Sequence, residues 1–125
     1  MPLRKYNPSS THAERAVQAW TILIGAAMSR QTLTYLGLSQ LMYRRNAAGV
    51  LNEILGHIAF YCRENKLPAL TSIVVGNKRG TPGKNIPVDH SQLDKIREKV
   101  YAYDWFNIAL PSVEELRTCF TRNAK

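Results

Sequence analysis

Apolar residues recur at helical spacing along most of the chain, which predicts a mostly helical protein. The first helix is expected from Thr11 to Met28, because Thr11 and Glu14 have the spacing of a capping box. A β-branched and aromatic segment from Thr32 to Tyr35 then precedes a short helical piece from Gly37 to Met42. Such a short piece suits the first helix of a helix-turn-helix. Its side chains expected to face inward are Leu38 and Leu41.

A long amphipathic helix is expected after the turn Tyr43-Arg44-Arg45, from Asn46 as N-cap to about Glu64. Its apolar stripe consists of Val50, Leu51, Ile54, Leu55, Ile58, Tyr61 and Cys62. Its opposite, polar face is expected to present Gly49, Asn52, Glu53, Gly56, His57 and Arg63. A glycine inside a helix costs about 1 kcal/mol relative to alanine. Gly49 and Gly56 on one face therefore indicate a close approach by DNA, by a partner helix or by the first helix of the same domain.

The segment from Leu70 to Val75 is rich in β-branched residues and is expected to form a strand. Glycine and proline residues then force a turn, and the tip from Asn77 to Asn85 carries three cations and no acidic residue. The three cations are Lys78, Arg79 and Lys84. A basic hairpin tip is typical of the wing of a winged helix, although a solvated loop would have a similar composition.

Two further helices are expected after the wing. Asp89 with Gln92 has the pattern of a cap for a helix that runs through Val100. Ser112 with Glu115 begins the last helix, and two aromatic residues between these helices, Trp105 and Phe106, are expected to fill the core. The fold class is therefore α+β: a small winged helix-turn-helix domain, mostly helical, with a β-hairpin wing and C-terminal helices. Residues 1–10 form a flexible arm and residues 11–125 a single domain.

The balance of charges favours a negatively charged partner. Lys and Arg number 17 against 9 Asp and Glu, which gives a formal net charge of +8 and attracts phosphate backbones or anionic membranes. A membrane partner is not expected, because the chain has no long apolar run and no strongly basic amphipathic helix. The first residues also lack the apolar core of a signal peptide, so we expect a cytoplasmic protein.

The sequence offers little for catalysis or metal binding. Cys62 and Cys119 follow apolar helical patterns, so both are expected to be buried, inert thiols. The three histidines are far apart and have no metal-ligand spacing, which predicts no metal and no cofactor. Pairs such as His57 with Glu53 lack a nucleophile beside them. We therefore expect no enzyme, and a metal-dependent nuclease is the enzyme class that the pattern excludes least.

The order of several short motifs resembles a known family. Thr34-Tyr35, the run Ala47-Ala48-Gly49-Val50-Leu51, Asn65 to Pro68 and Asn77-Lys78-Arg79-Gly80 follow one another as in the winged-helix DNA-binding region of alkylguanine alkyltransferases and alkyltransferase-like proteins. The resemblance covers roughly Gln31 to Gly83 and implies DNA binding. The family's nucleophilic cysteine would fall within Leu70 to Ile73, where this chain has none, which argues against alkyl transfer. Ala47 and Ala48 stand in place of the family's flipping arginine, a role that Arg45 could take.

Together these patterns predict a non-enzymatic protein that binds double-stranded DNA, such as a regulator or accessory protein of a bacterium, phage or mobile element. In a recognition helix the first turns read the bases, so Arg45 could pair with guanine or contact phosphate alone. The candidate DNA-binding residues are Arg44, Arg45, Asn46, Gly49, Asn52, Asn77, Lys78, Arg79 and Lys84. The alternative is a protein-binding adaptor or inhibitor on the same scaffold, with a partner or second copy on the Gly49 and Gly56 face.

Overall fold

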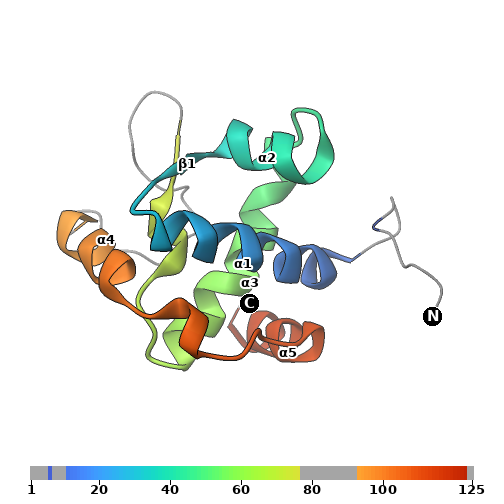
Figure 1. The fold of residues 1–125 in the computed structure, drawn as a ribbon. Coiled ribbons are helices and arrows are strands. Elements are labelled where there is room, and N and C mark those ends of the chain that lie inside the picture. Colours follow the sequence, from blue (N-terminus) through green and yellow to red (C-terminus); the bar gives the residue numbers. More distant parts are fainter. Residues whose placement is uncertain (1–5, 7–10, 77–92, 124–125) are drawn as a thin grey trace, which may run out of the picture.

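The computed structural model describes residue 6, residues 11–76 and residues 93–123 of the 125-residue chain (Figure 1). The described residues form five α-helices: α1 (His12–Met28), α2 (Tyr35–Tyr43), α3 (Ala48–Glu64), α4 (Leu93–Ala102) and α5 (Val113–Asn123). Two short strands, β1 (Leu33–Thr34) and β2 (Val74–Val75), pair in parallel. Two 3-10 turns complete the fold, η1 (Leu70–Ile73) and η3 (Trp105–Asn107). The prediction of a mostly helical small domain is confirmed.

Helix α1 lies across the middle of the molecule, with α2 on one side and α5 on the other (Figure 1). It packs on α3, α5 and η1 through alanines and large apolar side chains. The indole ring of Trp20 meets Tyr61 and Trp105 edge to face, each with 5.7 Å between ring centroids. Because such aromatic pairs stabilise beyond the area they bury, this cluster ties the first helix to α3 and to the C-terminal part of the chain.

Both predicted capping boxes at the ends of the chain are confirmed. At the start of α1 the Thr11 amide donates to the Glu14 carboxylate at 2.8 Å, and the Glu14 amide donates to the Thr11 hydroxyl at 3.2 Å. At the start of α5 the Ser112 amide donates to Glu115 at 2.9 Å, and the Glu115 amide donates to Ser112 at 3.1 Å. These local contacts satisfy amide groups that a helix start leaves unpaired.

The expected start of α3 is wrong by one residue. Its N-cap is Ala47 rather than Asn46, and no side chain caps the helix. The cause lies in α2: the buried Ser39 hydroxyl donates to the Arg45 carbonyl at 2.7 Å and accepts from the Ala47 amide. A serine from the preceding helix therefore binds the amide of the N-cap residue itself, whereas an N-cap side chain would bind amides of the first turn.

A strand was expected from Leu70 to Val75, but only the last two of these residues form one. Leu70–Ile73 forms η1, and β2 pairs with β1 in the register Leu33 with Val74 and Thr34 with Val75. All six residues are buried, so the burial pattern does not alternate as it does in a strand with one solvated face. The expected wing (Asn77 to Asn85) and the Asp89 cap lie outside the described residues.

Four expectations about which side chains are exposed are wrong, and one of them concerns Val50, which was expected on the apolar stripe of α3 but is 39% exposed. Leu41 points outward and is 59% exposed, and Phe106 is 66% exposed although its neighbour Trp105 is buried. On the polar face expected for α3, His57 and Gly56 are buried because α5 covers them. A Cβ atom on Gly56 would lie 3.2 Å from Cε1 of Phe120, so the close approach there comes from an aromatic side chain of α5. Gly49 faces open space instead.

Candidate nucleic-acid interface

The turn between α2 and α3 exposes two adjacent arginines. Helix α2 ends at Arg44, whose left-handed backbone (φ 61°) lets its amide donate to the Gln40 carbonyl at 3.0 Å. The chain then passes Arg45 and Asn46 and enters α3. Both arginine side chains are exposed, while the Ser39 contacts fix the backbone of the turn between them and the helix. The position of these cations is therefore set by the scaffold.

A third arginine joins this turn from α1. The Arg15 guanidinium carbon lies 4.4 Å from the ring centroid of Tyr43 and 4.7 Å from that of Tyr6. Its Nη1 donates to the Gln18 side chain at 2.9 Å and to the Met42 carbonyl at 3.4 Å. The Arg45 guanidinium carbon lies 5.8 Å from the same Tyr43 ring. Two guanidinium groups thus share one tyrosine ring at the end of α2.

Acidic residues are scarce around the turn. Between Glu14 and Glu53 the sequence contains no Asp or Glu, yet it contains Arg15, Arg30, Arg44 and Arg45. Glu53 on α3 pairs with His12 at 2.8 Å. The other ion pairs among the described residues involve α4, α5 or the end of α3: Arg30 with Glu98, Arg117 with Glu114, and Arg122 with Glu64. Within the described residues no carboxylate pairs with Arg15, Arg44 or Arg45, so this surface remains positively charged.

The structure brings five of the predicted site residues together. Arg44, Arg45 and Asn46 lie in the turn, Gly49 is exposed in the first turn of α3, and Asn52 follows half-buried one turn later. The other four, Asn77, Lys78, Arg79 and Lys84, lie outside the described residues. The turn and the start of α3 therefore form one continuous candidate surface.

Sequence reasoning missed Arg15 and Tyr43. Arg15 begins a row of residues spaced by four that continues through Ala19, Leu23 and Ala27, all of them buried. The sequence feature that could have indicated Arg15 is a cation at the end of a buried row. Such a cation needs a polar or aromatic neighbour when the row packs against another element. No local pattern could have shown that this neighbour is Tyr43.

Apolar side chains are also exposed on α2 and at the start of α3. They are Leu36, Leu41 and Val50. Exposed apolar side chains can contribute to a protein contact. This observation is the structural basis for keeping a protein partner as an alternative to DNA.

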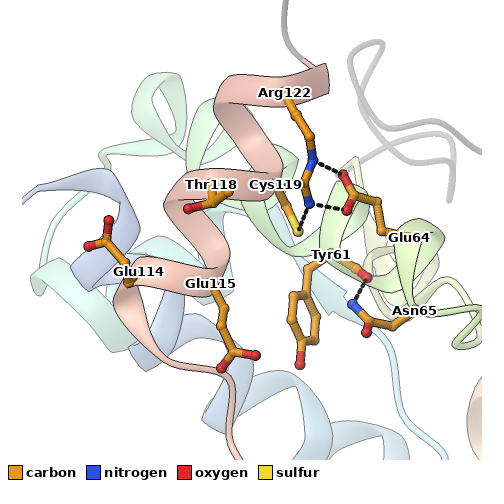
Figure 2. A pocket seen from close by; sticks show the side chains of 8 residues that line it. All are labelled: Tyr61, Glu64, Asn65, Glu114, Glu115, Thr118, Cys119 and Arg122. Carbon is orange, nitrogen blue, oxygen red and sulfur yellow. Dashed lines mark hydrogen bonds and ion pairs between the residues drawn. The ribbon is translucent and has the colours of Figure 1, made fainter.

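A separate hollow of about 340 Å³ lies between the end of α3 and α5 (Figure 2). Its charged groups already bind one another: both carboxylate oxygens of Glu64 accept from Arg122, which holds the pKa of Glu64 at about 2. Arg122 Nη2 also lies 3.8 Å from the Cys119 sulfur. Burial raises the pKa of the Cys119 thiol, which favours its unreactive neutral form. The hollow is therefore a weaker candidate site than the turn.

The second cysteine is more deeply enclosed. Cys62 lies on the buried stripe of α3, and burial raises the pKa of its thiol to about 12. A thiol with so high a pKa is protonated at neutral pH and is a poor nucleophile or metal ligand. Both cysteines are free and buried, as the sequence predicted.

Searches for other kinds of site give little more. Among the described residues no group of three or more His, Cys, Asp or Glu side chains is placed to hold a metal ion. None of the helices in the described ranges has the length and apolar character needed to cross a bilayer. Comparisons with protein-family models, with curated proteins and with solved structures gave no match. The resemblance to the alkyltransferase DNA-binding region therefore stays a prediction.

Proposed function

We propose that this protein binds duplex DNA and catalyses no reaction, with α2 and α3 acting as a helix-turn-helix. The observation that carries the proposal is the exposed pair Arg44 and Arg45, held in a rigid turn immediately before the exposed start of α3. In a helix-turn-helix the second helix enters the major groove with its first residues at the bases. Cations in the preceding turn then lie beside the phosphate backbone.

The roles of the individual residues follow from their exposure. Arg44 and Arg45 would contact phosphates, because their side chains are exposed and no carboxylate within the described residues neutralises them. Gly49 leaves open space at the helix start, which lets a base edge or sugar approach the backbone closely. Asn52 supplies an amide that can pair with adenine. Glu53 is an acidic residue near this surface, and its carboxylate lies 2.8 Å from Nδ1 of His12.

A wing after β2 would extend this interface. Val75 pairs with Thr34, and the Thr34 hydroxyl accepts from the Gly37 amide at 2.8 Å as the N-cap of α2. The chain therefore leaves β2 beside the start of the helix-turn-helix. Lys78, Arg79 and Lys84 follow within a few residues, so they could reach the backbone of the same DNA segment.

The test is the affinity for a labelled random duplex, measured by fluorescence anisotropy at several salt concentrations. The double variant Arg44→Ala/Arg45→Ala is expected to lower the slope of log K against log salt by about 2, because each phosphate contact contributes about 0.9. The control Lys95→Ala/Lys99→Ala removes the same charge from exposed positions of α4. Equal losses in the two double variants would mean that net charge alone drives binding and would refute the helix-turn-helix assignment.

A protein-binding adaptor is the second candidate, favoured by the exposed apolar side chains of Leu36, Leu41 and Val50. Charge separates the two functions, because a DNA reader needs its cations and an adaptor needs its apolar surface. If the wild-type protein fails to bind random duplex even at low salt, the adaptor becomes the better proposal. Sedimentation equilibrium would then show whether a second copy of the chain covers these side chains.

A further inference from the structure

Arg15 is a buried cation that pairs with no carboxylate among the residues that the structure describes. Its side chain is 9% exposed, and the two oxygen atoms that accept from its Nη1 are neutral: the Gln18 amide oxygen and the Met42 carbonyl. A guanidinium group carries five N–H donors. No nitrogen atom of Arg15 is among the buried side-chain atoms of the described residues that lack a hydrogen-bond partner, so its remaining donors face solvent. Buried charges are normally paired, because taking an ion out of water is costly. The solvent-facing donors of a cation that no described carboxylate neutralises are therefore available to an anion.

Arg30 provides a comparison at the other end of the same helix. Its guanidinium carbon also lies near a tyrosine ring, 5.2 Å from the centroid of Tyr101. Yet Arg30 donates through Nη2 to both carboxylate oxygens of Glu98, at 2.6 and 2.8 Å. In the described residues Arg15 has the tyrosine contact but no such carboxylate. The two arginines thus differ in the one feature that neutralises the charge.

A second cation lies near Arg15 and raises the need for an anion. Arg45 shares the Tyr43 ring with Arg15, and both guanidinium groups are positive. Two positive charges on one ring repel each other, and an anion beside both would offset that repulsion. A phosphate group has oxygen atoms that two guanidinium groups can bind through paired hydrogen bonds. Its negative charge would remove the repulsion.

We propose that Arg15, Tyr43 and Arg45 form a clamp for one phosphate group of a DNA backbone. This inference rests on the proposed function and identifies one of its anchoring contacts. Tyr43 holds the two guanidinium groups in place, and Arg15 reaches the clamp from α1. Because Arg45 belongs to the turn that leads into α3, a phosphate held here would fix the position of α3 along the groove. A structural role for Arg15 alone, as a cation at the C-terminal end of α2, is the competing explanation.

The experiment measures binding of a labelled random duplex by the full-length protein and four variants: Arg15→Met, Arg45→Ala, the two combined, and Arg30→Met as control. If both arginines bind one phosphate, each single variant is expected to bind about tenfold more weakly at 0.1 M salt and to lower the salt slope by about 1. The combined variant should lose little more than either single variant. The Arg30→Met variant should keep the wild-type slope.

Several outcomes would overturn the clamp. If Arg15→Met binds like Arg30→Met, Arg15 serves stability alone, although the protein still binds DNA. If the combined variant loses the product of the two single losses, the arginines contact different phosphates. If the wild-type protein does not bind duplex at all, the proposed function fails and the clamp fails with it. These results are distinguishable because the first two appear in the variants and the third in the wild type.

Two further measurements show whether a loss of binding comes from misfolding and whether the site prefers free phosphate to DNA. Arg15→Lys keeps the charge but loses the paired donors. Circular dichroism shows whether each variant is folded. A folded Arg15→Lys is expected to bind duplex with an affinity between those of wild type and Arg15→Met. Wild-type affinity in Arg15→Lys would refute paired hydrogen bonding.

A titration with inorganic phosphate, followed through the arginine Nε signals by NMR, tests whether the site binds free phosphate instead of DNA. A Kd for inorganic phosphate below that for duplex DNA would assign the site to free phosphate and refute the clamp.

Discussion

His57 is a polar residue enclosed between two helices. Its ring stacks on Phe120 of α5 with 4.0 Å between centroids and an interplanar angle of 4°. Its Nδ1 lies 2.8 Å from the Glu53 carbonyl oxygen, so Nδ1 carries the proton that it donates. Burial lowers the pKa of His57, and the nearby charges of His12 and Arg117 act in the same direction. The carbonyl and carboxylate of Glu53 oppose this shift without reversing it.

The first prediction at this scale concerns pH. Because the folded state disfavours protonated His57, the unfolded state binds more protons below the ordinary pKa of about 6.5. The free energy of unfolding should therefore be constant with respect to this group above that pH and should decrease as pH falls below it. Chemical denaturation of wild type and His57→Gln between pH 5 and 8 measures the effect. His57→Gln should lose this part of the pH dependence. His12→Gln should retain most of it, because burial is the larger cause of the His57 shift. Equal profiles for wild type and His57→Gln would contradict the assignment.

At the scale of elements, the turn between α2 and α3 depends on one hydroxyl group. Ser39 is fully buried and joins the Arg45 carbonyl to the Ala47 amide across the turn. The start of α3 has no side-chain cap of its own, and these contacts hold the backbone that leads into it. The turn that presents the arginines is consequently held by a residue outside it.

Ser39→Ala should destabilise the protein by about 1–2 kcal/mol, because it leaves two part-buried backbone groups without their partner. It should also weaken DNA binding at a temperature where the variant is folded, since the arginines lose their fixed position. Thr21→Ala is the control: Thr21 is exposed and its hydroxyl donates to the Val17 carbonyl at 3.3 Å. That change should cost less than about 0.5 kcal/mol. Urea unfolding compares the two, and a similar cost for both would show that the Ser39 bridge contributes little.

At the scale of the whole molecule, the chain after α4 is anchored through one tryptophan. Trp105 is buried, meets Trp20 edge to face and donates from Nε1 to the Val100 carbonyl at 2.7 Å. Tyr103 packs beside it with 4.7 Å between ring centroids. These contacts fasten the α4–α5 connection to α1, at the centre of the fold (Figure 1).

Trp105→Ala should therefore cost about 3–5 kcal/mol of unfolding free energy, which is a large share of the stability of a domain this size. Phe106→Ala should change stability by less than about 0.5 kcal/mol, because the ring is 66% exposed. Thermal and urea unfolding of the two variants provide the comparison. A large cost for Phe106→Ala would indicate that something covers this ring in solution.

The sequence predicted those features of the fold that depend on residues a few positions apart, and it missed those that depend on distant segments. Capping boxes join residues three positions apart, so Thr11 with Glu14 and Ser112 with Glu115 could be recognised from the chain alone. The Asn46 cap was predicted wrongly because the helix begins one residue later, after a turn whose backbone is held by Ser39 from the preceding helix. Among the site residues, Arg44 and Arg45 were predictable as exposed cations between two helices, whereas Arg15 was not.

The sequence by itself determined the described helices, their apolar stripes and the excess of positive charge, because these depend on neighbouring positions and on composition. The tertiary structure alone decided which faces are covered. It placed α5 over His57 and Gly56, left Leu41 and Phe106 outside, and brought Arg15 to Tyr43. The physical reason is that an amphipathic pattern states how much surface a helix must bury, but not which element buries it. That choice depends on the shapes and charges of segments far apart in the chain.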